Sequence, residues 1–181
     1  YNLQLNLQPS LASNGSCQQI RLKDPNLDMI PHLVSNSWAS TNAFDQAIKA
    51  LHAAGNSGSR CSSLGWPGAN EEVFTVGATA YQSKNIVYFS SRGPVSGEKY
   101  IKPDVVAPGE KIRSISARGT GYATMSGTSM ATPCVSGSIA LLLSARNELI
   151  GDIEGIKKIM QDSADKIESS DCSSSTKHPN K

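Results

Sequence analysis

Gly127–Pro133 reads Gly-Thr-Ser-Met-Ala-Thr-Pro and stands directly before a long apolar run. The small residues around Ser129 predict a tight turn that opens a helix. The run is apolar nearly all round, which is typical of a buried helix rather than an amphipathic surface helix. Backbone N–H groups in a first helical turn lack partners, so an oxyanion forming beside Ser129 would meet ready-made donors. The stretch therefore predicts a serine nucleophile at a helix start. The apolar residues are Val135, Ile139, Ala140, Leu141, Leu142 and Leu143.

Pro133 fits the same interpretation, because a proline in the first turn of a helix lacks only an N–H that would have no partner. Ser129 also has a plainer alternative role, since serine commonly caps the start of a helix. Both roles stay open on these residues alone.

Composition limits the class of protein. With 181 residues, of which 38% are hydrophobic, the chain predicts one globular domain. The net charge is +2 and the basic residues are scattered, so we expect no nucleic-acid partner. No apolar run approaches the roughly 18 residues of a membrane span, and the first residues are polar without a basic start. We therefore expect no membrane partner and no signal peptide, although the chain fits an excised mature piece.

The chain divides into three parts. Residues 1–16 show no steady period and predict a loose lead-in, and residues 168–181 are Ser-rich and polar with little to bury. Residues 17–167 form the predicted domain. Short apolar strands that alternate with helices favour a parallel α/β sheet. The predicted elements are a strand at 32–34 with an exit loop at 35–38, a helix at about 42–53, strands at 73–78 and 105–107, a hairpin within 111–125 and a helix at about 153–167.

The four cysteines are Cys17, Cys61, Cys134 and Cys172. They lack Cys-x-x-Cys spacing and paired histidines, which argues against a zinc site, and we predict no metal ligands. The count permits disulfides without requiring them, and Cys134 is expected to pack as a small apolar residue on the buried helix. The glycosylation sequon at residues 14–16 favours a secreted, secretory-pathway or lysosomal protein.

Three motifs in order resemble the C-terminal half of a subtilisin-like serine protease, of the subtilase or peptidase S8 family, and they are similar to its bacillopeptidase-like branch. They are Phe89–Pro94, Lys102–Gly109 and Gly127–Pro133. The resemblance extends more weakly to Ser37–Ala39, Ala54–Gly58 and Trp66–Gly68, and it covers residues 17–167. It implies an α/β, three-layer, doubly wound and mostly parallel sheet whose N-terminal part is missing.

The same resemblance implies a site. Ser129 would be the nucleophile that forms an acyl-enzyme, and Asn56 would donate its side-chain amide to the oxyanion. The backbone at Ser37–Ala39 would pair with an extended substrate strand. The implied substrate-binding residues are Ser37, Trp38, Ala39, Ala54, Gly55, Trp66, Gly68 and Thr128.

The chain departs from the family in its catalytic acid and base. No aspartate or histidine motif of the family is present, and His32, His52 and His178 lack the expected surroundings. A serine without a base is a weak nucleophile, so we expect this polypeptide alone to be nearly inactive. A missing N-terminal segment, supplied in trans or by a longer gene product, would provide the aspartate and the histidine.

The segment between Ala39 and Asn56 is a second departure. The predicted helix fills most of it and leaves no room for the apolar strand that the family places before Asn56. Gly55 would then be an ordinary glycine after a helix end. On this interpretation His52 lies on a helix with a solvated or half-buried side chain, and it does not act as a general base.

Smaller differences concern single positions. Ala39 stands where the family usually has glycine, which would narrow the substrate groove. Cys134 stands where a histidine commonly follows the proline. Asp45 and Asp104 are expected as a helix-face charge and as a strand-edge or loop residue.

These observations predict a serine-type endopeptidase acting on peptide or protein substrates. The alternative is a non-catalytic or truncated relative that binds extended peptides without cleaving them. Calcium often supports loops in the family, yet no dense cluster of Asp and Asn ligands stands out, so the cofactor is left open.

Overall fold

The computed structural model describes residues 35–36, 51–97, 100–116, 120–167 and 172, which all belong to one compact unit, Leu33–Lys181. The strands are β1 (Ser35–Asn36), β2 (Leu51–Ala53), β3 (Phe74–Thr79), β4 (Val105–Pro108), β5 (Ile112–Ile115) and β6 (Tyr122–Met125). The helices are α1 (Thr128–Ala145), the short 3₁₀ helix η1 (Asn147–Leu149) and α2 (Ile153–Ser163).

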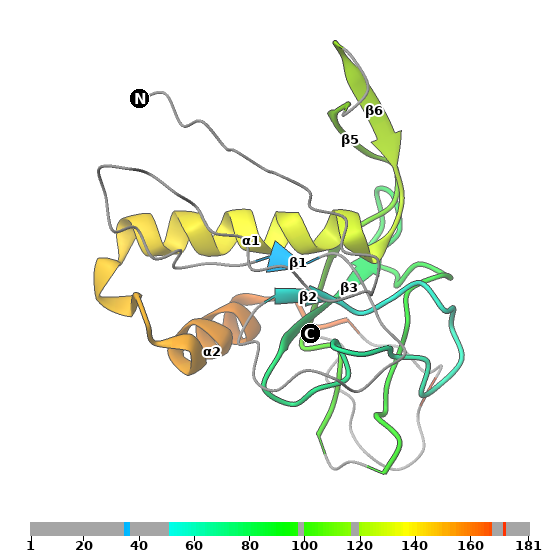
Figure 1. The fold of residues 1–181 in the computed structure, drawn as a ribbon, viewed down its shortest axis with the longest axis horizontal. Coiled ribbons are helices and arrows are strands. Elements are labelled where there is room, and N and C mark those ends of the chain that lie inside the picture. The colour runs from blue at the N-terminus through cyan, green and yellow to red at the C-terminus, as the bar shows by residue number, and fades with distance from the viewer. Residues whose placement is uncertain (1–34, 37–50, 98–99, 117–119, 168–171, 173–181) are drawn as a thin grey trace, which may run out of the picture. The chain divides into compact units, whose positions relative to one another are not determined.

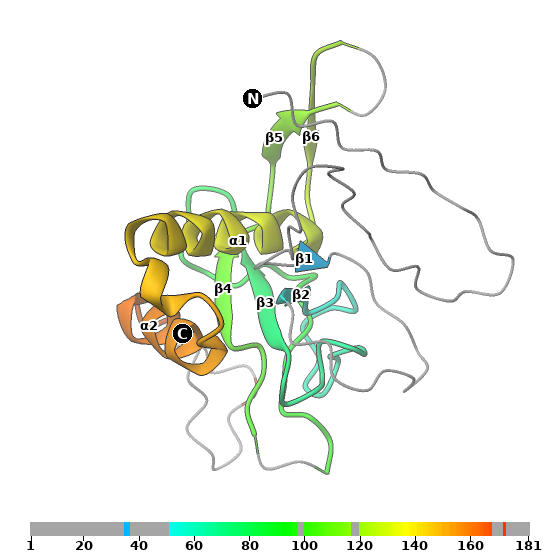
Figure 2. The same cartoon turned by 60° about the vertical axis from the view of Figure 1, so that its left-hand side comes forward.

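Strands β1 to β4 form a parallel sheet in sequence order (Figure 2). In the register, Ala53 lies beside Val76, and Val76 lies beside Val105. Every residue of β3 is buried, as the continuous apolar run of a parallel strand predicts. The sheet and its helices confirm the predicted α/β fold and the strands near residues 73–78 and 105–107.

The second strand corrects the sequence interpretation. Residues 51–53 were expected to end a helix, but they form β2, buried between β1 and β3. Leu51 and Ala53 also fit the two-residue period of a strand, and burial in the sheet outweighs the helical pattern over so short a piece. The rest of the predicted helix and the predicted strand at 32–34 lie outside the described residues. Ser35 and Asn36, expected in an exit loop, form β1.

Helix α1 covers one face of the sheet (Figures 1 and 2). Its side chains at four-residue intervals, Ala131, Val135, Ile139 and Leu143, join the strand side chains in the core. The expectation of burial all round is wrong within the described residues, since Leu141 on the other face is 73% exposed. One row of side chains meets the sheet, and no described segment covers the opposite row.

Two further features of α1 differ from expectation. The helix begins at Thr128, so Pro133 lies in the second turn rather than the first. It lies on the exposed side, where it has no N–H to offer the carbonyl of Ser129. The helix has 18 residues and a mean hydropathy of 1.3, and by length and composition alone it could cross a membrane. A core helix packed against a sheet meets the same criterion.

The predicted hairpin is present, with β5 and β6 antiparallel and Ile112 opposite Met125. It projects beside the N-terminal end of α1 (Figure 2). Helix α2 is shorter than predicted. Asp152 accepts a hydrogen bond from the main chain of Gly155 at its start, and the Ser163 hydroxyl donates to the carbonyl of Met160 in its last turn. A side chain thus occupies a carbonyl that a longer helix would bond through its backbone.

Candidate active site

Ser129 is the second residue of α1 and is half-buried. The turn before it is fixed by Gly109, whose carbonyl accepts a hydrogen bond from the Gly127 nitrogen at 2.8 Å. A Cβ at Gly109 would lie 2.5 Å from the Cβ of Ala78 and 2.8 Å from the Gly127 carbonyl oxygen. Only glycine therefore lets this turn lie directly on β3, just before the first turn of α1 that carries Ser129.

Asn56 lies beside this turn. Its side-chain oxygen accepts hydrogen bonds from the nitrogen of Thr128 at 3.0 Å and from the Thr128 hydroxyl at 3.1 Å. The Thr128 hydroxyl in turn accepts one from the Gly55 nitrogen at 3.2 Å. The side-chain nitrogen of Asn56 lies near Gly127, 3.5 Å from where a Cβ of that glycine would stand. The structure thus brings Asn56, Thr128 and Ser129 together.

The spacing objection to Asn56 is wrong. The strand that the family places before this asparagine is present as β2, which ends at Ala53. Gly55 therefore follows a strand, not a helix, and its φ of +101° lies in the region that glycine adopts readily. His52, expected to be solvated or half-buried, is fully buried in β2 at 0% exposure.

Sequence reasoning missed how Ser91 supports the turn at Asn56. The Ser91 nitrogen donates to the Gly55 carbonyl at 2.9 Å, and its hydroxyl accepts a hydrogen bond from the Ser57 nitrogen at 3.0 Å. Ser91 is fully buried. The Phe89–Pro94 motif was the available signal, but its partner lies 34 positions away in sequence.

The other predicted substrate-binding residues that the structure describes lie next to Gly55 and Asn56. Ala54 is fully buried and donates its backbone N–H to the Val76 carbonyl at 2.9 Å. Trp66 is half-buried, and a Cβ at the buried Gly68 would lie 2.9 Å from the Ala53 carbonyl oxygen. The segment at 66–68 therefore packs on the end of β2. Ser37, Trp38 and Ala39, like His32 and His178, lie outside the described residues.

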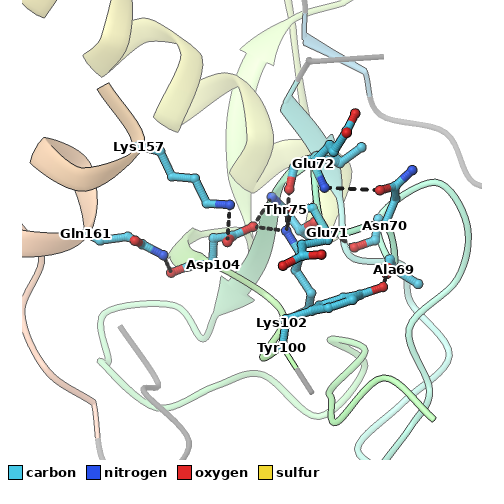
Figure 3. A network of polar contacts seen from close by, with 12 residues as sticks. Ala69, Asn70, Glu71, Glu72, Thr75, Tyr100, Lys102, Asp104, Lys157 and Gln161 are labelled. Atoms are coloured by element: carbon cyan, nitrogen blue, oxygen red, sulfur yellow. Dashed lines mark hydrogen bonds and ion pairs between the residues drawn. The ribbon is translucent and has the colours of Figure 1, made fainter. Parts of the chain in front are cut away.

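A buried ion pair between Lys102 and Asp104 lies near the residues that follow the segment at 66–68 (Figure 3). The Lys102 ammonium lies 2.6 Å from Asp104, whose second carboxylate oxygen lies 3.2 Å from the Lys157 ammonium on α2. Burial lowers the pKa of Lys102, while Asp104 opposes that change. Asp104 stands in the loop before β4, as expected, but its burial was not predicted.

Cys61 and Cys172 form a disulfide. Cys134 is free and exposed, which corrects its expected packing inside the helix, because position 134 falls on the uncovered face of α1. Partial burial of its thiol raises the pKa of Cys134. Cys17 and Asp45 lie outside the described residues. In the part of the chain that the structure describes, no group of three or more His, Cys, Asp or Glu could hold a metal ion.

The chain matches the subtilase family over residues 9–178, and it belongs to that family. It is 36% identical over 153 residues to the serine protease AprX of Bacillus subtilis (strain 168), covering 74% of this chain and 34% of that protein. It is 40% identical over 146 residues to pyrolysin of Pyrococcus furiosus, covering 64% of this chain and 10% of that protein.

Solved protease structures are also similar to this chain. Sphericase superposes with a TM-score of 0.61 at 28% identity, covering 73% of this chain and 48% of that one. The prenylagaramide maturation protease PagA gives a TM-score of 0.56 at 36% identity, covering 69% of this chain and 43% of that one. The chain therefore spans about half of these solved relatives and about a third of AprX.

Proposed function

We propose that this chain carries the nucleophile half of a serine endopeptidase. The observation that supports it best is the pairing of Asn56 with Thr128 beside Ser129 at the start of α1. The Ser129 hydroxyl oxygen would attack the scissile carbonyl carbon, the C–N bond would break, and the amine would leave as an acyl-enzyme forms. The Ser129 nitrogen and the Asn56 side-chain nitrogen would donate to the oxyanion.

The base comes from elsewhere on this proposal. The sequence has no aspartate or histidine motif of the family, and the chain spans about half of its solved relatives. A segment carrying both residues, in a longer product or in trans, would take the Ser129 proton and return it to the leaving amine. The chain alone would be close to inactive, because a serine without a base is a weak nucleophile.

The substrate would be an extended peptide or protein segment. It would pair with the backbone at Ser37–Ala39 and place one side chain against Gly55 and Trp66. The buried Ala54 and Gly68 would support that wall from within the domain. Thr128 would contribute through its hold on Asn56. The net charge of +2 favours neither nucleic acid nor an acidic membrane as partner. The Cys61–Cys172 disulfide favours an oxidising, secretory compartment.

A second candidate is peptide binding without cleavage. Two features together favour this candidate: the turn around Ser129 is present, and the family's aspartate and histidine motifs are absent from the sequence. Such a protein would bind an extended peptide with the same affinity whether residue 129 is serine or alanine, and it would show no turnover.

The test is labelling with a fluorophosphonate probe, with the adduct located by mass spectrometry and Ser129→Ala as the control. We expect almost no labelling of the chain alone. We expect Ser129 to be labelled once a segment of AprX that carries the aspartate and histidine motifs of the family is added. Absence of labelling in the mixture, or equal labelling of Ser129→Ala, would contradict the proposal.

A further inference from the structure

The segment at residues 65–73 is held to the domain by side chains that bond its main-chain carbonyls. Thr75 donates from its hydroxyl to the Gly68 carbonyl at 2.6 Å, and Tyr100 donates to the Ala69 carbonyl at 2.8 Å. Lys102 donates to the carbonyls of Glu71, at 3.2 Å, and Val73. Four carbonyls in six residues thus accept from side chains, so the path of the segment depends on side chains outside it (Figure 3).

The same segment lies against the candidate active site. Gly68 has no room for a Cβ beside the Ala53 carbonyl, and Gly55, which bonds Thr128, lies close to the Gly65 backbone. A shift of this segment would therefore change the space beside Asn56 and Ser129. The shift need not disturb the turn that holds Ser129, because that turn is fixed separately by Gly109.

Lys102 connects this segment to the rest of the fold. Its side chain is 1% exposed, and it lies between the two carbonyls and the Asp104 carboxylate, which also accepts a hydrogen bond from the Thr75 nitrogen at 2.7 Å. Lys157 reaches the same carboxylate from α2. A buried ammonium with three acceptors has a fixed position, since each lost partner would leave a buried polar group unsatisfied.

We propose that Tyr100 and Lys102 are positioning residues that set the shape of a specificity pocket walled by residues 65–70. The inference rests on the proposed function, since it takes the space beside Ser129 as the place where a substrate side chain binds. Tyr100 holds the main chain at Ala69, and Lys102 holds the main chain at Glu71 and Val73, just before β3 begins. Neither touches the substrate, and both act through the backbone they hold.

The test measures selectivity rather than activity. Acetylated tetrapeptides that differ only in their C-terminal residue, alanine, leucine or phenylalanine, are titrated by calorimetry into the full chain. Tyr100→Phe removes one hydroxyl and keeps the ring, so it should fold. Lys102→Met removes the charge at similar length. The matched controls are Tyr88→Phe, at a tyrosine 76% exposed, and Lys84→Met, in an exposed ion pair.

We expect Tyr100→Phe to change the affinity ratio between the phenylalanine and alanine peptides by roughly tenfold, the scale of one methylene's fit in a pocket. Lys102→Met should change it in the same direction, and the controls should keep the wild-type ratio. Equal weakening of all three peptides by Tyr100→Phe, an unchanged ratio, or no binding by the wild type would overturn the proposal. Fluorophosphonate labelling of Ser129 in the AprX mixture reports separately on the proposed protease function.

Discussion

The side-chain oxygen of Asn56 lies 3.0 Å from the main-chain nitrogen of Thr128, which joins the loop after β2 to the first residue of α1 across 72 positions of sequence. A carboxamide held by its oxygen has its nitrogen left to donate. Because that nitrogen lies next to Gly127, the contact orients a donor toward the helix start where Ser129 stands.

Asn56→Ala should therefore slow acylation. In the mixture that supplies the family's base, we expect the rate of fluorophosphonate labelling at Ser129 to fall by about 10²- to 10³-fold, the usual effect of removing one oxyanion donor. Asn85→Ala, at an exposed asparagine, is the control and should label at the wild-type rate. Equal rates for the two variants would remove Asn56 from the oxyanion site.

Gly109→Ala should destabilise the turn before Ser129. Its Cβ would meet the Cβ of Ala78 and the Gly127 carbonyl within 2.8 Å, and we expect a loss of about 1–3 kcal/mol in the free energy of unfolding. Gly137→Ala, with open space around the position on α1, should instead gain about 1 kcal/mol. Urea unfolding compares the two, and a destabilised Gly137→Ala or a neutral Gly109→Ala would contradict the described packing.

Reduction of the Cys61–Cys172 disulfide should lower the free energy of unfolding by about 2–5 kcal/mol, because the disulfide closes a loop with a sequence separation of 111. Thermal melts with and without reductant measure the change. In Cys61→Ser, reductant should have no further effect on the melting temperature. A wild type that melts at the same temperature in both buffers would argue against this disulfide.

The contribution of Lys102 to stability should rise with pH just below pH 10.5. Burial lowers the pKa of Lys102 below its ordinary 10.5, so between the lowered value and 10.5 the unfolded chain binds the proton and the folded chain releases it. Within that window the part of the unfolding free energy that depends on Lys102 should increase by up to about 1.4 kcal/mol per pH unit. At lower pH both states hold the proton and this slope disappears.

Lys102→Met provides the comparison for that measurement. The variant should lack the Lys102 contribution, so the difference between its unfolding free energy and that of the wild type should vary with pH only in this window. The Lys84→Met variant, at an exposed lysine, should follow the wild type. A constant difference across the whole range would mean that burial does not change the proton affinity of Lys102.

Local pattern predicted much of the fold. Strand β3 and strand β4 are short apolar runs, and the hairpin at β5 and β6 follows from glycines between two short strands. Strand β2 was missed because Leu51–Ala53 is only three residues long and follows a helical period, and the neighbours that bury it lie far along the chain. The uncovered face of α1 was missed for a related reason, since its sequence is apolar on both sides.

The sequence predicts the residue types of the candidate site but not their geometry. Ser129 and Asn56 follow from the family resemblance, whereas the Thr128 contact and the support from Ser91 depend on pairs distant in sequence. The burial of Lys102 and Asp104 also had no local signal, because charged residues around a proline are typical of an exposed loop. Their mutual pairing is what makes the burial tolerable.

The Cys61–Cys172 disulfide has a consequence for a chain that meets other proteases. A single cut anywhere between the two cysteines, such as in the exposed β5–β6 hairpin, leaves two fragments that are still one covalent molecule. Asn56 stands close to Cys61 on the first fragment, and after a hairpin cut Ser129 stands on the second, so nicking would not let them diffuse apart. Such a molecule would migrate as one species until a reductant separated its halves.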